Sequence, residues 1–424
     1  MSPLLIALAL FLQPNEAAPS KDGVQPKPAG DVGVPHFEEL VGLALQHRPE
    51  FTMGRMLVRA AVGDAIQAGL YPNPFLAYVA DEIGAEGGAG QQGLEIAQTV
   101  VTAGKLTLAR RAGLERARLR EAELDQLRWT VSREVGTALV AYLQALADQM
   151  LLADLVRIAE SQMRAVQALL DEGAATRMDL LQAQIEYRRA LAELEAARVR
   201  AAQAREALAA SIGVPSSQLP PPEEMDYSLS VPEYGVEQLR NLILSQLPAL
   251  KLADIAVDIA RAFYRLELAR FWPDLVVSGG AGYDDSSSDA IASAGLGFEL
   301  PIFNRNQGAI AASRARLAAA ENLRRTFDLL ARRAFSQQWA QYAAAREQIR
   351  RYETQVIPNA EENLALVREA YERGEVDYLS LLVAQRTLFD VRRELLQFKA
   401  QALQALIQLR YLDVTVLNAD PMMQ

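Results

Sequence analysis

Few side chains in this sequence belong to the types that perform catalysis or bind metals. The chain contains no cysteine and two histidines, His36 and His47, which lie eleven residues apart around a predicted helix. Thiolate metal sites, disulfides and Cys/His nucleophilic chemistry are therefore absent. The segment Asp284 to Asp289 carries three carboxylates within six residues, but their spacing matches no calcium-binding loop, and a solvated turn is expected. The sequence thus predicts no enzyme activity, no cofactor and no metal site.

The composition is that of an ordered protein with an acidic balance. Of 424 residues, 50% are hydrophobic and 23% are charged, and 43 basic residues stand against 53 acidic ones for a net charge of -10. A chain of this length can bury sizeable apolar surface and has room for two or three ordinary domains. Because no basic excess is available to attract a phosphate backbone, nucleic acid is not an expected partner.

The N-terminus resembles an export signal. Residues 4–12 form an apolar run of nine, too short for a membrane-spanning helix but suited to the apolar core of a signal peptide. We expect a signal peptide over residues 1–19 and an extended tether over residues 20–35. The alternative is a shortened start or a buried strand. Elsewhere no apolar run reaches eighteen residues, so no helix is expected to span a membrane, although spanning β-strands carry a weaker signal.

The chain repeats one unit of about 200 residues. An offset of 201 residues places Gly173 on Gly374 and Pro72 on Pro273. The same offset aligns Leu180 and Leu181 with Leu381 and Leu382, and Ala183 and Gln184 with Ala384 and Gln385. The predicted boundaries are a first repeat at residues 36–213, a proline-rich linker at 214–234, a second repeat at 235–413 and a tail at 414–424.

Both repeats predict the same order of elements. Two short helices (about 36–47 and 50–69; about 235–246 and 249–270) precede two glycine-rich strands (75–83 with 93–101; 275–283 with 291–300). A long helix (about 104–170; about 306–372) and a returning helix (about 176–212; about 377–411) follow. At 1.5 Å per residue each long helix is on the order of 100 Å in length. Pro358 is the one helix breaker in these long stretches and predicts a kink near Thr354 to Pro358, where the first repeat has Arg157.

The returning helices carry a seven-residue apolar repeat. In the second repeat the two registers are Leu381, Leu388, Leu395, Ala402 and Leu409, and Ala384, Val391, Phe398, Ala405 and Leu412. In the first repeat they are Leu180, Tyr187, Leu194, Ala201 and Leu208, and Ala183, Ala190, Ala197, Ala204 and Ser211. A strict seven-residue period predicts left-handed coiled-coil packing, and the small residues allow close approach of neighbouring helices.

These elements predict a mainly α-helical protein with a small β part: two long antiparallel coiled-coil hairpins and four strands per chain. Such a chain could be a scaffold, a spacer or part of a tube. A coiled-coil adaptor or scaffold without a pore is the alternative to a tube, although an adaptor would normally carry one hairpin flanked by β-rich domains. Four strands cannot satisfy their backbone groups in lipid unless several chains pool them.

The second repeat contains a distinctive series of short motifs. They are Val356-Ile357-Pro358-Asn359-Ala360, Leu364, Tyr371, Gly374, Tyr378-Leu379-Ser380-Leu381-Leu382 and Ala384-Gln385, and the strand exit Leu300-Pro301-Ile302-Phe303. With these motifs the sequence resembles the TolC family of outer-membrane efflux channels, most nearly its CusC-like and CzcC-like branch. In the first repeat Gly173, Asp179-Leu180-Leu181 and Ala183-Gln184 match the pattern again. The resemblance covers the chain from about His36 to about Leu412.

The resemblance implies a homotrimer in the outer membrane with a long periplasmic extension. Each protomer would give four strands to a twelve-stranded β-barrel and four long helices to an α-helical tube. Its partners would be a periplasmic adaptor, an inner-membrane pump and outer-membrane lipid, and it would act as the passive exit duct of a tripartite pump. The branch favours export of heavy-metal cations over other small toxic solutes.

The hairpin tips are the candidate functional residues. Gly173 and Gly374 are expected to take the left-handed conformation that ends a helix, and Thr176 and Asp377 to cap the helices that follow. Asp179 lies three residues after Thr176 and completes the pattern of a capping box. By resemblance the tips also contact the adaptor hairpin; these residues are Gly173, Ala174, Ala175, Gly374, Glu375 and Val376.

The resemblance further implies a constricted periplasmic entrance near the tips. Asp179 matches an entrance aspartate of the family, and three copies would make a ring that favours cations. Asp377 and Ser380 fall in the corresponding part of the second repeat. Ser380 and Val383 occupy positions where some relatives carry aspartates, so the strongest acidic rings of the family are missing here.

Overall fold

The computed structural model describes residues 37–83, 90–219, 236–285 and 287–414. The predicted signal peptide, tether and His36, the linker after residue 219 and the tail after residue 414 lie outside these ranges. The chain forms two compact units. The hairpin unit comprises Met1–Pro49, Leu127–Leu247 and Leu330–Gln424, and the sheet unit comprises Glu50–Gln126 and Pro248–Leu329. Each unit draws on both sequence repeats, so the compact units do not coincide with them.

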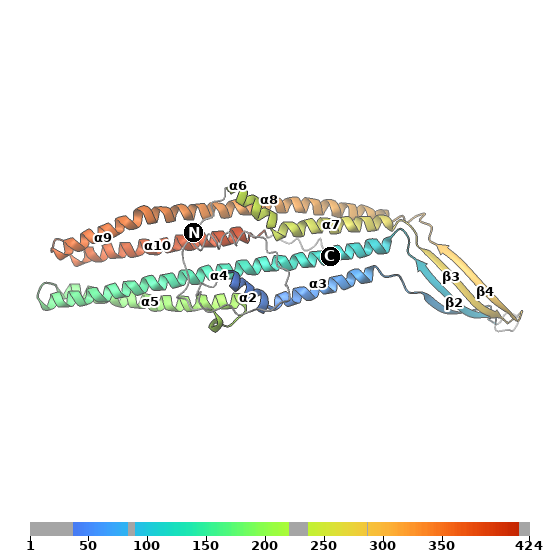
Figure 1. The fold of residues 1–424 in the computed structure, drawn as a ribbon, viewed down its shortest axis with the longest axis horizontal. Helices are drawn as coiled ribbons and strands as arrows, with labels where there is room; N and C mark the ends of the chain where they lie inside the picture. Colours follow the sequence, from blue (N-terminus) through green and yellow to red (C-terminus); the bar gives the residue numbers. More distant parts are fainter. Residues whose placement is uncertain (1–36, 84–89, 220–235, 286, 415–424) are drawn as a thin grey trace, which may run out of the picture. The chain divides into compact units, whose positions relative to one another are not determined.

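Helices make up most of the described chain (Figure 1). The short leading helices are α2 (Phe37–His47), α3 (Pro49–Ala68), α6 (Val236–Gln246) and α7 (Pro248–Ala269). The long helices are α4 (Lys105–Asp171) and α8 (Gln307–Arg351), the latter continued by a π-helical segment (Tyr352–Val356) and α9 (Ile357–Glu372). The returning helices are α5 (Arg177–Ile212) and α10 (Tyr378–Arg410), and a short 3-10 turn (Ser216–Gln218) follows α5. The predicted helix order is confirmed.

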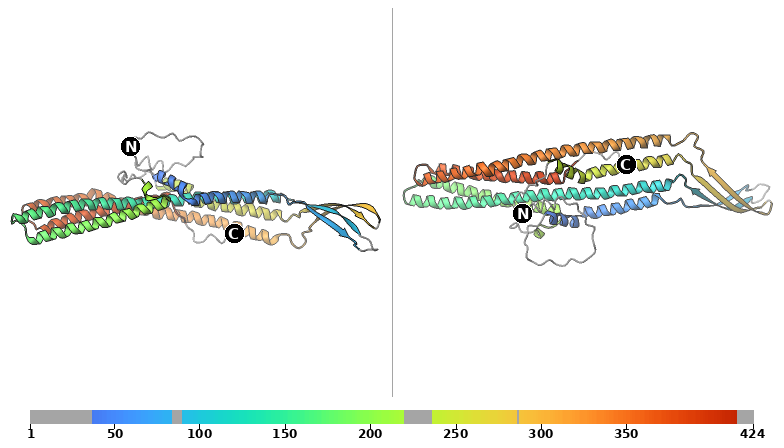
Figure 2. Two further views of the ribbon diagram at one scale, coloured as in Figure 1. Left: turned by 90° about the horizontal axis from the view of Figure 1, so that it is seen from below. Right: turned by 45° about the horizontal axis from the view of Figure 1, so that its top comes forward.

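The seven-residue repeats form the packing seams of the hairpin unit. In α10, Leu381, Leu388, Ala402 and Leu409 are all buried, and so are Ala384 and Ala405. In α5, Leu180, Leu194, Ala201 and Leu208 are buried with Ala183, Ala190 and Ala197. Leu412, just beyond α10, is also buried. The remaining heptad residues are half-buried, and none is exposed. Figures 1 and 2 show α5 beside the second half of α4, and α10 beside α9, as antiparallel pairs.

One helix in the described residues is long and apolar enough to cross a membrane by length and composition. One 18-residue window of α4 contains at most two charged side chains, and 22% of it is buried. The sequence prediction of no such helix rested on uninterrupted apolar runs, whereas this window tolerates a few charged residues. A single window of this kind is weak support for a span, and α4 pairs with α5 in a coiled-coil hairpin.

Four antiparallel strands form one sheet in the order β1-β2-β3-β4. Their bounds are β1 Phe75–Asp81, β2 Gln91–Val100, β3 Leu275–Asp284 and β4 Asp289–Phe298. Strand β2 pairs with β3, so the hairpins of the two repeats join across their inner strands. Strands β1 and β4 are the two edges of this sheet. The predicted strands are confirmed, with β2 and β4 each beginning two residues earlier than expected.

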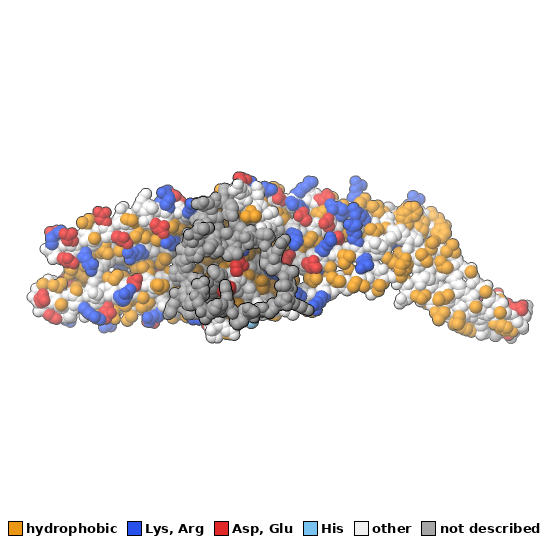
Figure 3. Space-filling model, in the orientation of Figure 1, with side chains coloured by type: hydrophobic (Ala, Val, Ile, Leu, Met, Phe, Trp, Pro, Cys, Tyr) orange, Lys and Arg blue, Asp and Glu red, His pale blue; other side chains and the backbone are white. Residues whose placement is uncertain are grey.

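Alternation sorts the side chains of the sheet onto two unlike faces. The apolar face carries Leu94 and Ile96 of β2, with Tyr78 and Leu76 opposite them on β1, and it continues across β3 and β4 to Leu296 and Phe298. Leu76, Tyr78, Leu94 and Leu296 are each more than half exposed. The other face, which we call the polar face, carries all four acidic residues of the strands. Its middle rows hold mostly glycine, alanine and serine, with Phe75, Val79 and Ile291 on the edge strands. Figure 3 shows hydrophobic side chains gathered over the strands.

The base of the sheet is tied to the start of α4 through Asp274. The Asp274 Oδ1 atom accepts a hydrogen bond from the Thr102 N–H at 2.8 Å and pairs with Lys105 Nζ at 2.8 Å. Burial acts to raise the pKa of Asp274, but the hydrogen bonds from Lys105 and Thr102 and the charge of Lys105 outweigh it and hold the pKa below its ordinary value. The segment that enters β3 in the second repeat is therefore fixed to the helix entry of the first repeat.

Candidate functional site at the hairpin tips

Both hairpin tips turn through the same backbone motif. Gly173 has φ 76° and Gly374 has φ 74°, the left-handed region in which a Cβ is penalised. Beyond them, the Ala174 N–H donates to the Leu169 carbonyl at 2.7 Å and the Glu375 N–H donates to the Ala370 carbonyl at 2.9 Å. These contacts between residues five apart are those of a Schellman motif, which satisfies the last carbonyls of a helix. The predicted left-handed glycines are confirmed.

The helix that follows each tip begins with a side-chain cap. Thr176 and Asp179 form a full capping box: the Asp179 N–H donates to Thr176 Oγ1 at 3.2 Å, and the Thr176 N–H donates to Asp179 Oδ2 at 2.9 Å. In the second hairpin, Asp377 Oδ1 accepts from the Ser380 N–H at 2.9 Å and from the Ser380 hydroxyl at 2.6 Å. Both predicted caps are confirmed, and Ser380 is a partner of Asp377 within its cap.

The Ser380 contacts also set the ionisation of the second cap. Hydrogen bonds from the Ser380 hydroxyl and from its N–H favour the charged form, so the pKa of Asp377 lies below its ordinary value. The Asp377 carboxylate therefore stays ionised at neutral pH at the N-terminus of α10, where a negative charge also interacts favourably with the helix dipole.

The two tips share one hydrophobic core. Val166 and Leu180 from the first hairpin and Tyr378 and Leu381 from the second form a single buried cluster, which Ala183 completes. The ring of Tyr378 lies 6.0 Å from that of Tyr371 and is 5% exposed. Burial raises the pKa of Tyr378 to about 12, so its hydroxyl remains neutral. The ends of the two hairpins are therefore held together within one chain.

The outer surface of the tips includes apolar side chains that the sequence analysis did not single out. Met178 is 71% exposed and Leu379 is 53% exposed, and the two residues match at the repeat offset of 201. Gly173, Ala174 and Glu375 are also exposed, whereas Ala175 and Val376 are half-buried. The signal that could have identified Met178 and Leu379 was their apolar character just after a cap, where a helix surface is usually polar.

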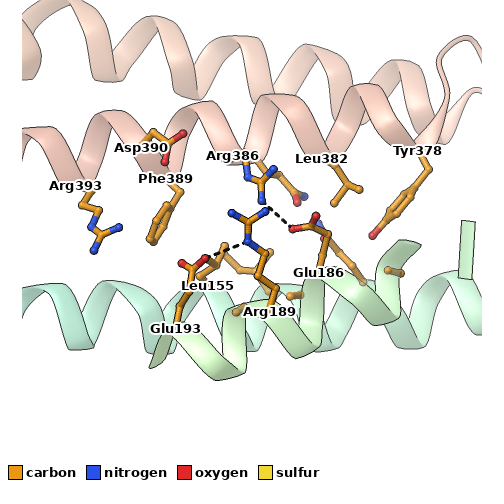
Figure 4. Close-up of a pocket in the computed structure, with 16 residues that line it drawn as sticks. Leu155, Glu186, Arg189, Glu193, Tyr378, Leu382, Arg386, Phe389, Asp390 and Arg393 are labelled. Atoms are coloured by element: carbon orange, nitrogen blue, oxygen red, sulfur yellow. Dashed lines mark hydrogen bonds and ion pairs between the residues drawn. The ribbon is translucent and has the colours of Figure 1, made fainter. Parts of the chain in front are cut away.

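Charged side chains line a groove of about 170 Å³ between the hairpins (Figure 4). Arg386 of α10 lies 3.4 Å from Glu186 of α5, while Arg189 and Glu193 pair within α5 at 3.2 Å. Farther from the tips, Arg393 of α10 and Arg200 of α5 both donate to Asp148 Oδ2 of α4, at 3.1 and 3.0 Å. Ion pairs thus connect the two hairpins along the side of the shared tip core.

The helix of the second repeat departs from α-helical geometry just before Pro358. Residues Tyr352–Val356 are π-helical, and the Ile357 N–H donates to the Tyr352 carbonyl, five residues back. Pro358 has no N–H to donate, and the wider turn accommodates the ring. The matching residue of the first repeat, Arg157, lies within the uninterrupted helix α4. The irregularity is thus confined to one of the two long helical stretches.

The described residues contain no group of three or more His, Cys, Asp or Glu side chains placed to hold a metal ion. In the Asp284 to Asp289 segment, Asp284 and Asp289 are paired strand residues at the end of the sheet. Asp284 Oδ2 accepts a hydrogen bond from Gln91 at 3.3 Å, and Ser286 is outside the described residues. His47, at the end of α2, is exposed.

Comparison with known proteins assigns the chain to a family. The family described as "Outer membrane efflux protein" matches twice, over residues 40–214 and 239–413. The chain is 28% identical to the cobalt-zinc-cadmium resistance protein CzcC of Cupriavidus metallidurans over 410 residues, covering 95% of this chain and 96% of that protein. It is 26% identical over 294 residues to the nickel and cobalt resistance protein CnrC of the same species, covering 68% of each.

Solved structures show the same fold. The CusC structure aligns with a TM-score of 0.70 at 20% identity and covers 93% of this chain and 98% of that chain. The outer membrane protein VceC of Vibrio cholerae also aligns with a TM-score of 0.70 at 20% identity, covering 88% of this chain and 94% of that chain. With most of both repeats matched and the helical hairpins and sheet in place, the chain belongs to the outer membrane efflux protein family.

Proposed function

We propose that this outer-membrane efflux protein works as a homotrimer and forms the exit duct of a tripartite pump that exports divalent heavy-metal cations. The observation that carries the proposal is the four-stranded sheet with two free edges and one apolar face. A sheet edge in hydrocarbon leaves backbone groups without partners at a cost of several kcal/mol each. Three chains of four strands give an even count of twelve, within the range of membrane β-barrels.

Exposed aromatic side chains support a membrane boundary at the base of the sheet. Tyr71 is 63% exposed, Trp272 is 60% exposed and Phe303 is 89% exposed, all in the segments that connect helices and strands. Aromatic residues of this kind gather at the interfaces of membrane β-barrels. The alternative of an adaptor or scaffold without a pore has no comparable use for an exposed apolar sheet face, and the family match does not support it.

The two tips are the proposed contact surface for the adaptor. Gly173, Ala174, Ala175, Gly374, Glu375 and Val376 form the turns, and Met178 and Leu379 add exposed apolar area beside them. Small turn residues allow a partner helix to approach closely, and two apolar side chains at matched positions provide equivalent contacts on both hairpins. The pump and adaptor would take energy from the inner membrane, while this chain conducts passively.

The periplasmic entrance is proposed to lie at the same end. Asp179, Asp377 and Ser380 occupy the first turns of α5 and α10, and Asp179 is half-buried. In a trimer, three copies of each aspartate would surround the axis and favour cations. We propose Pro358 and the π-helical turn before it as the point at which the second long helix bends.

The division into repeats stays a proposal as well. We propose that residues 36–213 and 235–413 arose by duplication, joined by a linker at residues 214–234. The double family match supports this interpretation.

The substrate class rests on relatives named for resistance to cobalt, zinc, cadmium and nickel. A deletion strain complemented with the wild-type gene or with an empty vector tests it. We expect the strain without the gene to accumulate Zn²⁺, Co²⁺ or Cd²⁺ and to retain normal levels of a hydrophobic dye. Raised dye accumulation with unchanged metal content would contradict the metal assignment and favour a drug-type pump.

A further inference from the structure

One carboxylate lies in the middle of the sheet and away from its ends. Glu95 is the fifth residue of β2, and the register places it opposite Ala77 of β1 and Gly280 of β3. Gly280 in turn pairs with Ser293 of β4. Residues directly opposite each other share a face, so Glu95 belongs to the polar face, in a row of alanine, glycine and serine.

Glu95 is half-buried, and its neighbours in the row have small side chains. Gly280 has no side chain, and a Cβ added there would meet Ser293 Oγ at 2.7 Å and the Glu95 Cα at 3.7 Å. The next residues along β2 on the same face are Gly93 and Ala97. Glu95 is therefore the one long side chain in the central row of this face.

No basic group compensates this charge within the sheet. The four strands contain no lysine or arginine. Among the described residues, Glu95 takes part in no ion pair and no side-chain hydrogen bond. An ionised side chain at membrane depth is tolerated where it meets water, because hydrocarbon cannot solvate it. The apolar face, on the opposite side of the same strand, is the one suited to lipid.

We propose that Glu95 is a cation-selecting residue of the pore inside the sheet, with one copy from each protomer. The inference rests on the proposed trimeric duct and adds a selective position in the sheet to those proposed at the periplasmic entrance. Carboxylates on a pore wall raise the local concentration of cations and lower that of anions. Asp81, Asp284 and Asp289 lie on the same face in a single row at the turn end of the sheet and add to the same field.

The absence of cysteine from the chain allows a direct test of which face meets water. Glu95→Cys and Ile96→Cys differ by one residue and place a single thiol on opposite faces of β2. In trimers reconstituted into phospholipid vesicles, a charged methanethiosulfonate reagent should label Cys at 95 and leave Cys at 96 unmodified. Equal labelling of both, or labelling at 96 alone, would overturn the assignment.

Single-channel recording under a KCl gradient tests the selectivity itself. Glu95→Gln should move the reversal potential toward zero, and Glu95→Lys should move it farther in the same direction. On the Glu95→Cys channel, the anionic and the cationic methanethiosulfonate reagents should shift the potential in opposite directions. The double variant Glu95→Gln/Thr99→Glu, which moves the charge along the same face, should recover cation preference.

The outcomes separate this inference from the function on which it rests. Suppose that wild type, Glu95→Gln and Glu95→Lys all form pores of normal conductance with the same reversal potential. This result would overturn the role of Glu95 and leave the proposed duct intact. A wild-type protein that forms no pores would contradict the proposed function. If Glu95→Gln fails to assemble, the reagent pair on Glu95→Cys gives the same comparison in one preparation.

Discussion

At the scale of single residues, the tips combine two demands on the same side chains. Asp179 closes a capping box with Thr176 and is also the proposed entrance carboxylate. Asp377 is itself the N-cap of α10, and its carboxylate accepts from the Ser380 N–H. A cap uses one or two oxygen lone pairs of a carboxylate and leaves its charge in place, so the two roles are compatible. Substitutions that keep the oxygen acceptor but remove the charge distinguish them.

Asp179→Asn should change conduction more than stability. The amide oxygen can still accept the Thr176 N–H, so we expect a loss well under about 1 kcal/mol in the free energy of unfolding. Cation preference of single channels should fall because each protomer loses one entrance charge. Thr176→Ala is the matched control: it removes the Oγ1 acceptor, should cost about 1 kcal/mol and should leave the charge in place. A large melting shift with unchanged cation preference in Asp179→Asn would indicate a capping role alone.

The carboxylate of Asp274 should make the base of the sheet sensitive to acid. Its pKa is lower in the folded protein than in the unfolded chain, so its stabilising contribution is complete above the ordinary aspartate pKa and is lost as the pH falls through the folded value. We expect Asp274→Asn to lower the melting temperature at pH 7 and to flatten its decline below about pH 4. Asp64→Asn, an exposed change on α3, is the control. An unchanged acid profile for Asp274→Asn would refute the assigned link to Lys105.

At the scale of elements, the turn geometry of the tips can be separated from their packing. Gly374 has positive φ, and an added Cβ would meet nothing within 4 Å. A side chain there is penalised by the backbone alone, at roughly 1–2 kcal/mol. We expect Gly374→Val to keep the trimer yield, to abolish efflux-dependent resistance and to prevent adaptor crosslinking at residue 375.

The control for this change is Gly42→Val in α2. A Cβ added at Gly42 would also meet nothing within 4 Å, but Gly42 does not have a positive φ. It should keep both resistance and crosslinking. Loss of the trimer in Gly374→Val, or full resistance with normal crosslinking, would show that the tip is wrongly assigned.

Leu381 and Leu379 form a matched pair for the shared tip core. Leu381 is 5% exposed within that core, whereas Leu379, two residues earlier, is 53% exposed. Leu381→Ala should destabilise the hairpin unit by about 2–5 kcal/mol, because it removes buried methyl groups and leaves a cavity. Leu379→Ala should leave the melting temperature nearly unchanged and weaken adaptor crosslinking. Equal melting shifts in the two variants would contradict the shared core.

Periodicity explains why these helices could be predicted so closely from the sequence. The heptads of α5 and α10 are long and regular, and their boundaries fall at glycine turns and capping residues that have few alternative uses. The order of the four strands followed from the repeat and its turn residues. By contrast, the joining of β2 to β3 depends on pairing between residues more than 170 apart, which local pattern does not encode.

The candidate site was predictable only where local chemistry determines it. The capping box and the left-handed glycines are short-range features, and the sequence contains them in full. The shared core around Tyr378 and the ion pair between Arg386 and Glu186 arise from contacts between two hairpins, so no single segment indicates them. Glu95 became informative once the register showed that its neighbours are Ala77 and Gly280.

At the scale of the whole molecule, the proposed exit duct requires several chains acting together. The sheet has free edges at β1 and β4 and an apolar face whose side chains are largely exposed in one protomer. The entrance ring, the selective carboxylate inside the sheet and the adaptor surface all presuppose that three copies surround one axis. Pooling strands removes the edges, and lipid covers the apolar face.

The native mass of the protein extracted from the outer membrane in mild detergent tests this central claim most directly. We predict that the protein fractionates with the outer membrane and has three times the mass of the single processed chain, which is 46.5 kDa for the 424 residues of this sequence. Recovery from the periplasm as a soluble monomer would contradict it.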